Sequence, residues 1–265
     1  MVTGRDTIRR ITPDTLLSAR HRRRGQPFHP EPIALRRLKR IEHASRDVLL
    51  DPVALEALIG ELGLNDHYSD YMPMALHPQL GKGLRISQYP NQFAPYLASL
   101  VDREIPSYVE IGVQHGGTFA TTVTYLRTTG HPLARALAVD TLQSYGAERF
   151  ARQSRGVDFF RGDSHSREFA TLAETIVPGA LVMIDGDHSY EACRADVALA
   201  DNLGAAVVVL HDIVSARDQD VVAVWQQIRE SLDDRYEFCE FTAQYRDVQT
   251  RHPGVYLGIG VAIRR

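Results

Sequence analysis

The sequence predicts an α/β fold in which a doubly wound, mostly parallel sheet of seven strands is preceded by helices and closed by an antiparallel C-terminal hairpin. Two observations lead to this prediction. After Ser107, short apolar runs rich in β-branched residues alternate with amphipathic helical segments, which is typical of parallel strands buried on both faces. Near the C-terminus, two strand-like runs follow each other without a helical pattern between them, which indicates an antiparallel pair.

The composition fits one large domain, or one domain with an appendage. The chain has 265 residues, of which 44% are hydrophobic, and this is enough to form a core. The formal net charge of −3 gives no general reason to expect a polyanionic partner. We therefore divide the chain into an N-terminal helical extension or lid, residues 1–105, and an α/β domain, residues 106–265.

Three further features lead us to expect a soluble, cytoplasmic protein without a membrane partner. The two cysteines, Cys193 and Cys239, are too few for a disulfide framework or a four-thiolate zinc site, which favours a reducing compartment. No run approaches the roughly 18 apolar residues that span a membrane. The charged residues near the N-terminus are not followed by the apolar core of a secretory signal.

The first 43 residues are strongly basic. They include Arg20, Arg22, Arg23, Arg24, Arg36, Arg37, Lys39 and Arg40. One interpretation is a contact with nucleic acid or an acidic partner. The other is a solvated helix face or a disordered arm, which charge runs of this kind more often form. Nucleic acid is therefore not the expected partner.

Three helices are predicted before the sheet. Apolar residues at helical spacing predict the first over residues 31–45. Asp51 as the N-cap and Gly63 after the last residue predict the second over residues 52–62. A third is predicted over residues 88–100, after a loop.

The elements of the sheet follow in order. Five buried strands are predicted at residues 108–111, 136–139, 157–160, 181–184 and 206–210. The helices between them are predicted around residues 117–127, 147–155, 166–176 and 190–202. A last helix around residues 221–232 precedes the hairpin strands, 236–242 and 254–263, whose polar connection is predicted to lack a helix.

Three strand ends predict a cofactor that contains a nucleoside, because ligands of doubly wound sheets bind beyond the carboxyl ends of the strands. The first strand leads into a glycine-rich turn and a helix N-terminus, where backbone can approach a ligand closely. The second ends at an acidic residue placed for ribose hydroxyls, and Gly-Asp-Ser after the third offers an acceptor to an adenine amino group. The expected cofactor-binding residues are Glu110, Gly112, Val113, Gly116, Gly117, Thr118, Asp140, Asp163 and Ser164.

The glycine spacing favours S-adenosylmethionine over a nicotinamide dinucleotide. Gln114 stands where the dinucleotide motif Gly-x-Gly-x-x-Gly has its second glycine. That glycine lets the backbone approach a pyrophosphate, and S-adenosylmethionine has no pyrophosphate. The sequence therefore predicts S-adenosylmethionine as the cofactor.

The next two strand ends predict a metal site. Asp185, Asp187 and His188 follow the fourth strand, and His211 and Asp212 end the fifth. Adjacent parallel strands lie about 4.8 Å apart, so Asp185 and Asp212 are expected to share a ligand. Two carboxylates without thiolates favour a hard divalent cation, Mg²⁺ before Mn²⁺. Asp187 either takes part in this site or caps the next helix.

These motifs resemble a known family. Residues 110–113 with Gly116 are similar to the cofactor motif of the cation-dependent O-methyltransferases, such as the catechol and caffeoyl-coenzyme A methyltransferases. The run Asp-Gly-Asp-His-Ser-Tyr, residues 185–190, more closely resembles the macrocin and mycinamicin sugar O-methyltransferases and the related cephalosporin hydroxylase-like proteins. The resemblance covers roughly residues 106–265 and implies a Rossmann-like class I methyltransferase domain.

The resemblance also implies a mechanism. Asp185, His211 and Asp212 match the family's metal ligands, and Asp185 would also contact the cofactor. The metal would lower the pKa of the acceptor hydroxyl, His188 would be the catalytic base, and the alkoxide would attack the sulfonium methyl group. The family has an acidic residue in place of His211, so either His211 faces away and water completes the coordination, or the metal is a softer one.

The segment before the sheet is expected to cover the cofactor and to shape the acceptor pocket, as the preceding helices do in this family. Gln88 is expected to contact the cofactor and Gln92 to lie nearby, with Tyr68, Tyr71 and Met72 on a lid. Packing and helix capping are the alternative roles for these residues.

The predicted function is metal-dependent methylation, by S-adenosylmethionine, of a hydroxyl group on a small molecule, such as a sugar of a natural product. A hydrolase or hydroxylase-like enzyme that uses the metal to activate water is one alternative. A nucleic-acid methyltransferase or binding protein that uses the basic N-terminus is the other. Homo-oligomers formed through the N-terminal helices are expected by default.

Overall fold

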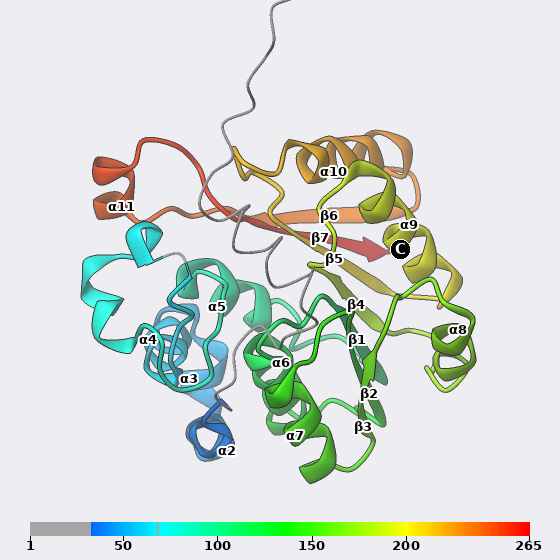
Figure 1. Ribbon diagram of the computed structural model, residues 1–265, viewed down its shortest axis with the longest axis horizontal. Coiled ribbons are helices and arrows are strands. Elements are labelled where there is room, and N and C mark those ends of the chain that lie inside the picture. The colour runs from blue at the N-terminus through cyan, green and yellow to red at the C-terminus, as the bar shows by residue number, and fades with distance from the viewer. Residues whose placement is uncertain (1–32, 68) are drawn as a thin grey trace, which may run out of the picture.

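The computed structural model describes residues 33–67 and 69–265, and one seven-stranded sheet lies at its centre (Figure 1). Its strands, in the order β3-β2-β1-β4-β5-β7-β6, are β1 (Ser107–Ile111), β2 (Arg135–Asp140), β3 (Val157–Arg161), β4 (Leu181–Ile184), β5 (Val207–His211), β6 (Tyr236–Phe241) and β7 (Ile259–Arg264). The first five strands pair in parallel, and β7 is antiparallel to both β5 and β6. The structure therefore confirms the predicted fold class, including the C-terminal hairpin.

The helices between the strands lie where the sequence predicts them, within a few residues. They are α6 (Gly117–Thr128), α7 (Tyr145–Gln153), α8 (Arg167–Ala173), α9 (Tyr190–Asn202) and α10 (Gln219–Ser231). Serine caps set two of the starts, because the Ser144 hydroxyl accepts a hydrogen bond from the Ala147 amide and the Ser166 hydroxyl accepts one from the Phe169 amide.

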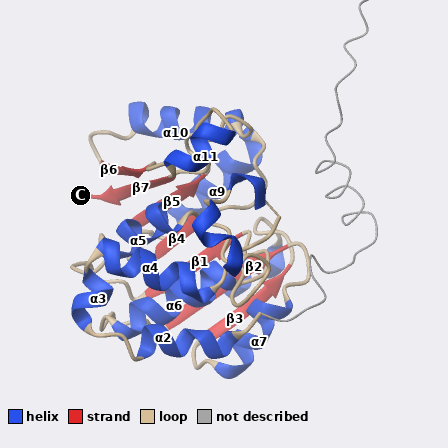
Figure 2. Cartoon of the chain, turned by 90° about the vertical axis from the view of Figure 1, so that its left-hand side faces the viewer, coloured by secondary structure: helices blue, strands red, loops and turns tan. Residues whose placement is uncertain are grey.

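The two faces of the sheet are covered by different helices. On one face, α6 and α7 pack against the sheet together with the N-terminal helices (Figures 1 and 2). On the other face, α8, α9 and α10 pack against the sheet in a second apolar cluster, which includes Trp225. Because both faces are covered, the strand ends are the part of the sheet that is open to a ligand.

The N-terminal helical pattern is broken into shorter pieces than predicted. Instead of one helix over residues 31–45, a 3₁₀ turn, η1 (Leu35–Leu38), leads into α2 (Lys39–Glu42), and α3 (Arg46–Leu50) is a separate helix. The break occurs because the Ser45 hydroxyl accepts a hydrogen bond from the Val48 amide and so begins a new helix. Residues 31 and 32 lie outside the described residues.

The next helices follow the prediction more closely. They are α4 (Pro52–Leu62), whose first turn is capped by the Asp51 carboxylate through the Val53 amide at 2.8 Å, and α5 (Pro90–Ala98). Between them, the segment predicted as a loop contains two 3₁₀ turns, η2 (Ser69–Tyr71) and η3 (Met74–Gln79).

The prediction that the hairpin connection lacks a helix is wrong. A short helix, α11 (Arg246–Arg251), lies between β6 and β7. Its Asp247 and Arg251 side chains bind the backbone of the η2–η3 segment, and such tertiary contacts are not visible in a local sequence pattern.

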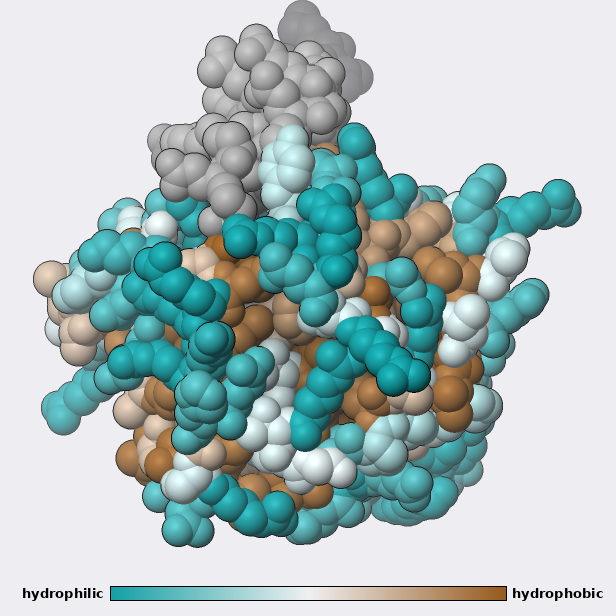
Figure 3. Space-filling view, turned by 90° about the horizontal axis from the view of Figure 1, so that it is seen from below, coloured by the Kyte–Doolittle hydropathy of each residue, from teal (hydrophilic) through white to brown (hydrophobic). Residues whose placement is uncertain are grey.

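Two surface features bear on possible partners. Of the basic residues near the N-terminus, Arg37 and Arg40 contact Glu61 of α4, whereas residues 20–24 lie outside the described part of the chain. No helix among the described residues is long and apolar enough to cross a membrane. On the face shown in Figure 3, hydrophilic side chains spread among smaller hydrophobic areas.

Candidate active site

A cavity of about 900 Å³ opens at the carboxyl ends of β1 to β5. It lies beside the point between β1 and β4 where the strand order reverses, which is the usual ligand position in doubly wound sheets. Its volume is within the range of small-molecule sites. The loops after the strands form one wall, and parts of residues 67–72, 87–89 and 256–257 form another.

The glycines after β1 allow backbone segments to approach each other. Gly112 has a φ of +88°, and a Cβ there would lie 2.0 Å from the Asp185 carbonyl oxygen, so this glycine lets the end of β1 rest against the end of β4. A Cβ on Gly117 would lie 2.0 Å from the Leu84 carbonyl oxygen. Of the predicted cofactor residues in this turn, Glu110, Gly112, Val113 and Thr118 line the cavity, whereas Gly116 and Gly117 pack against α7 and residues 84–85.

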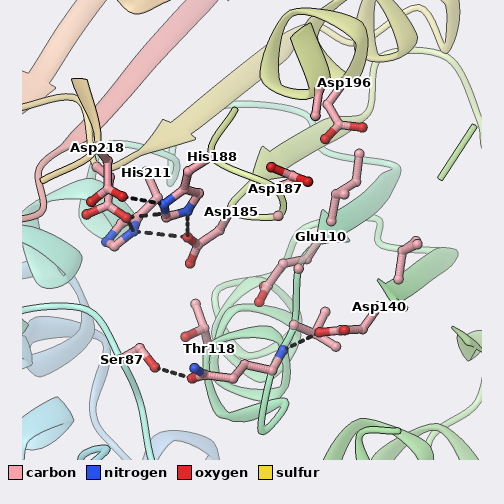
Figure 4. A pocket seen from close by; sticks show the side chains of 18 of the residues that line it. Ser87, Glu110, Thr118, Asp140, Asp185, Asp187, His188, Asp196, His211 and Asp218 are labelled. Carbon is pink, nitrogen blue, oxygen red and sulfur yellow. Dashed lines mark hydrogen bonds and ion pairs between the residues drawn. The ribbon is translucent and has the colours of Figure 1, made fainter. Parts of the chain in front are cut away.

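Gln114 joins the two walls of the cavity, a role that the sequence pattern does not predict. Its φ of +47° is uncommon for a residue with a side chain. Its amide donates to Asp140 Oδ2 at 2.8 Å, and its side-chain oxygen accepts from the Ser87 hydroxyl at 2.8 Å, as the dashed lines at Asp140 and Ser87 in Figure 4 mark. The same oxygen accepts from Asn65 Nδ2 at 3.0 Å. The other Asp140 oxygen accepts from the Leu142 amide at 2.8 Å, so the carboxylate is held in one orientation at the end of β2.

Glu110 and Gln88 bring polar groups to the middle of the cavity. Glu110 is 2% exposed and accepts a hydrogen bond from the Tyr108 hydroxyl; burial raises the pKa of Glu110 to about 8. Gln88 Nε2 donates to Asp185 Oδ2 at 3.1 Å, and Gln88 Oε1 accepts from the Thr118 hydroxyl. The structure thus places Gln88 between the glycine-rich turn and the end of β4.

The β3 end of the cavity contains a buried carboxylate that the sequence pattern does not predict either. Asp163 and Ser164 line this end as predicted, and Asp163 Oδ1 accepts from the His165 amide at 2.8 Å. The Ser164 hydroxyl donates to Oδ1 of Asp196, a residue of α9, at 2.9 Å. Asp196 is 3% exposed, and burial raises its pKa against the opposing effect of the Ser164 hydrogen bond.

Asp185, His211 and Asp212 form a compact group at the ends of β4 and β5. His211 Nδ1 lies 3.2 Å from Asp185 Oδ1 and 3.2 Å from Asp212 Oδ2, so the alternative in which His211 faces away is wrong. Burial lowers the pKa of His211, but the two carboxylates raise it well above its usual value. Asp212 has a φ of +63°, a conformation that Asp tolerates better than most residues.

His188 lies beside this group and is oriented by Asp218. Its Nδ1 is 2.9 Å from Asp218 Oδ1, and its Nε2 is 3.5 Å from Asp185 Oδ1 and 3.6 Å from Asp212 Oδ2 (Figure 4). The Ser215 hydroxyl donates to the other Asp218 oxygen at 2.6 Å. Burial lowers the pKa of His188, but hydrogen bonds with Asp185 and Asp218 and the nearby charge of Asp212 raise it to about 10. The sequence pattern gives no signal for Asp218, which is the N-cap of α10.

Two sets of three side chains could each hold a metal ion. Asp185, His211 and Asp212 form one, and His188, Asp212 and Asp218 form the other; within each set the possible ligand atoms lie within 4.8 Å of one another. Asp187 is in neither set: its Oδ1 accepts from the Ser189 amide at 2.9 Å at the start of α9.

The predicted lid residues divide into those at the cavity and those away from it. Tyr71 and Met72 line the cavity, whereas Tyr68 lies outside the described residues. Arg251 of α11 donates to the Asp70 and Met72 carbonyl oxygens, both at 2.7 Å, which fixes this segment. Gln92 binds the backbone of the β6–β7 connection and does not line the cavity.

Comparison with known proteins supports a methyltransferase. Residues 109–213, which include β1 to β5 and the loops of the cavity, match the family described as a methyltransferase domain. This match confirms the prediction of a methyltransferase in this part of the chain. No curated protein matches the sequence.

Several solved structures resemble this chain at low identity. The O-methyltransferase from Bacillus cereus in complex with SAH is 12% identical, with 84% of this chain and 93% of that chain covered and a TM-score of 0.49. TomG from Streptomyces achromogenes, an O-methyltransferase involved in tomaymycin synthesis and crystallised with SAM, is 16% identical, with 83% and 99% covered and a TM-score of 0.46. The SAH-bound Podospora anserina methyltransferase PaMTH1 is 13% identical, with 100% of both chains covered and a TM-score of 0.47.

Proposed function

We propose that the chain transfers the methyl group of S-adenosylmethionine to a hydroxyl oxygen of a small molecule. The match of residues 109–213 to a methyltransferase domain supports this proposal. One observation carries the proposal. A single cavity joins the acidic and polar residues at the ends of β1, β2 and β3 to the imidazole–carboxylate group at the ends of β4 and β5. The first part suits a nucleoside with an amino-acid tail, and the second suits the removal of a proton from a hydroxyl group.

The first part of the cavity offers an acceptor for each donor group of S-adenosylmethionine. Asp140, oriented by two backbone amides, is placed for the ribose hydroxyls. Glu110 and Gln88, near the glycine-rich turn, are placed for the amino-acid end. Asp163 and Ser164, at the end of β3, are then placed to contact the adenine base of the cofactor. This order directs the sulfonium centre toward the ends of β4 and β5.

The donor set at the ends of β4 and β5 fits a divalent cation. Asp185 and Asp212 offer carboxylate oxygens, the ligands that Mg²⁺ and Mn²⁺ prefer, and His211 adds an imidazole nitrogen, which Mg²⁺ rarely takes. When bound, such a cation supplies Lewis acidity that lowers the pKa of an acceptor hydroxyl. We propose Mg²⁺ or Mn²⁺ for this position, with the nitrogen donor favouring Mn²⁺.

His188 is the proposed catalytic base. Asp218 holds its Nδ1, so Nε2 is the nitrogen that faces Asp185 and Asp212. A hydroxyl group placed beside these two carboxylates is therefore within reach of a fixed imidazole nitrogen. Ser215 holds Asp218 in turn, so the imidazole ring needs little reorganisation when it takes the proton.

The acceptor is expected to enter past the lid. Tyr71 and Tyr256 line the cavity at the lid, the entrance that we call the mouth of the cavity, and their ring centroids lie 4.8 Å apart. The guanidinium carbon of Arg217 lies 6.0 Å from the Tyr71 ring centroid. Ring faces of this kind pack against other rings, including the apolar faces of sugars. A hydroxylated ring compound, such as a sugar of a natural product, is therefore our proposed acceptor class.

The test is product formation with a panel of sugars and phenols in the presence of S-adenosylmethionine and Mg²⁺ or Mn²⁺. We expect S-adenosylhomocysteine and a methyl ether in equal amounts, loss of turnover with a chelator, and recovery on adding the cation back. Asp212→Ala should abolish turnover. Asp234→Ala, an exposed change in the turn before β6, should leave turnover unchanged. A product formed without S-adenosylhomocysteine would identify the hydrolase or hydroxylase-like alternative instead.

A further inference from the structure

The β3 end of the cavity, which lies farthest along the sheet from β5, contains the buried carboxylate of Asp196. Asp196 projects from α9 into the space between the loops after β3 and β4, and it lies apart from the His188–His211 group (Figure 4). It is neither an expected cofactor residue nor a member of either candidate metal set among the described residues. A buried carboxylate at a ligand cavity calls for a physical reason, because burying a charge is costly unless it is paired.

Both polar neighbours of Asp196 contact the same carboxylate oxygen. The Ser164 hydroxyl donates to Oδ1 at 2.9 Å, and His165 Nε2 lies 2.9 Å from that oxygen. A serine hydroxyl has one hydrogen to donate, and a neutral imidazole also has one. Asp196 therefore takes the only side-chain hydrogen that each neighbour can donate.

This arrangement fixes which hydrogen-bonding groups remain for a ligand. The Ser164 oxygen keeps a free lone pair, the neutral form of His165 keeps a free Nδ1, and the Asp163 carboxylate, whose Oδ1 accepts from the His165 amide, can only accept. All three residues line the cavity. Their side chains therefore present acceptors, and no donors, at this end.

We propose that Asp196 is a positioning residue that fixes this polarity and thereby makes the cavity select a purine with an amino group at C6 over one with an oxygen at C6. This inference rests on the proposed function, which places the base of the cofactor beside Asp163 and Ser164. The 6-amino group of adenine donates hydrogen bonds to these acceptors. The 6-oxo group of hypoxanthine has only lone pairs to offer, so it faces acceptors and leaves polar groups unpaired.

A merely structural role for Asp196 predicts a different result. If the carboxylate only anchored the loop after β3, its loss would weaken both kinds of purine ligand by the same factor. If it fixes the polarity, its loss changes the ratio of the two affinities. An Asn side chain makes this distinction, because its NH₂ group can donate to Ser164 or His165 and release that neighbour's own hydrogen toward the ligand.

The experiment is isothermal calorimetry on the full chain at pH 8, where free imidazole is neutral. The two probes are S-adenosylhomocysteine and its deaminated analogue S-inosylhomocysteine. We expect the wild type to bind S-adenosylhomocysteine on the order of 30-fold more tightly, the factor that one or two unpaired polar groups produce. For Asp196→Asn we expect the ratio to fall to about 3-fold or less.

Two further variants control for folding and for charge. Glu191→Gln removes one exposed negative charge from the same helix and should leave the ratio unchanged. If Asp196→Asn does not fold, Ser164→Ala removes one of the acceptors, and it should lower the ratio as well.

The outcomes are distinct. Equal weakening of both probes by Asp196→Asn would overturn the polarity role. Equal binding of both probes by the wild type would overturn it too, while leaving the proposed function in place. If the wild type bound neither probe, the proposed function itself would fail, and this inference with it.

Discussion

A divalent cation is expected to displace protons from His188 and His211 when it binds. In the protein without metal, burial lowers the pKa of both imidazoles, but Asp185, Asp218 and Asp212 raise that of His188 to about 10. Asp185 and Asp212 raise the pKa of His211 well above its usual value. Both imidazoles therefore hold an extra proton at pH 7. Three negative charges then face two positive ones, and a divalent cation beside two neutral imidazoles gives the same balance.

The size of the effect follows from this exchange. The metal-free form holds more protons than the metal-bound form, so a rise in pH favours binding. Each proton released makes the association constant rise about tenfold per pH unit, or about 1.4 kcal/mol, at pH values below the imidazole pKa. Between pH 6.5 and 8.5 the affinity for Mn²⁺ should therefore increase about 100-fold if one proton leaves, and about 10⁴-fold if both leave.

Calorimetry counts these protons directly. Mn²⁺ is titrated into chelator-treated protein at pH 7 in two buffers with different heats of ionisation, and the difference in observed heat gives the number of protons released. His188→Gln should release about one proton fewer than the wild type, because one imidazole is gone, whereas Asp234→Asn should behave as the wild type. Binding that releases no protons and does not vary with pH would refute the reasoning.

Three other predictions concern the architecture of the cavity. Gly112→Ala should lower the free energy of unfolding, measured by urea titration, by roughly 3 kcal/mol or more, because its Cβ would lie 2.0 Å from a carbonyl oxygen. Gly130→Ala, at a similar φ of +93° but in open space, should lower it by only about 1 kcal/mol. Equal losses in the two variants would show that the steric clash at Gly112 does not occur. Burial raises the pKa of Glu110 above its unfolded value of 4.5 to about 8, so ionisation of Glu110 destabilises the ligand-free fold as the pH rises from 4.5 to 8. Glu110→Gln should therefore stabilise the fold by up to about 4 kcal/mol at pH 7.5 and hardly at all at pH 4. A loss of stability in this variant at pH 7.5 would contradict the prediction. Arg251→Met removes two hydrogen bonds to the lid backbone, so amide exchange in residues 70–72 should become about 30-fold faster, for a local loss of about 2 kcal/mol. Arg246→Met on the same helix should leave exchange unchanged, and unaltered exchange in Arg251→Met would show that the lid is held by other contacts.

The strand ends could be predicted from the sequence because the fold makes them equivalent. Once apolar runs alternate with helices, the residues at the carboxyl end of each run must reach the same edge of the sheet, and this placed Glu110, Asp140, Asp185 and Asp212 at one cavity. The family resemblance added a role for His188, which the structure places beside Asp185 and Asp212, the two carboxylates of a candidate metal set.

The supporting residues could not be predicted, because their positions depend on contacts between distant elements. Asp218 is the N-cap of one helix and Asp196 lies within another, so each fits an ordinary helical pattern in the sequence. Only the packing of these helices against the loops brings them to His188 and Ser164. Gln114 signalled the absence of a dinucleotide motif, but its contacts with the opposite wall depend on a left-handed backbone that glycine more often adopts.

A crystal structure of the full chain with S-adenosylhomocysteine and Mn²⁺, measured at the manganese absorption edge, tests the central claim most directly. We predict an anomalous peak between the carboxylates of Asp185 and Asp212, with the cofactor sulfur directed toward His188 and the adenine beside Ser164. A manganese peak elsewhere, or an adenine bound at the Tyr71 mouth of the cavity, would contradict it.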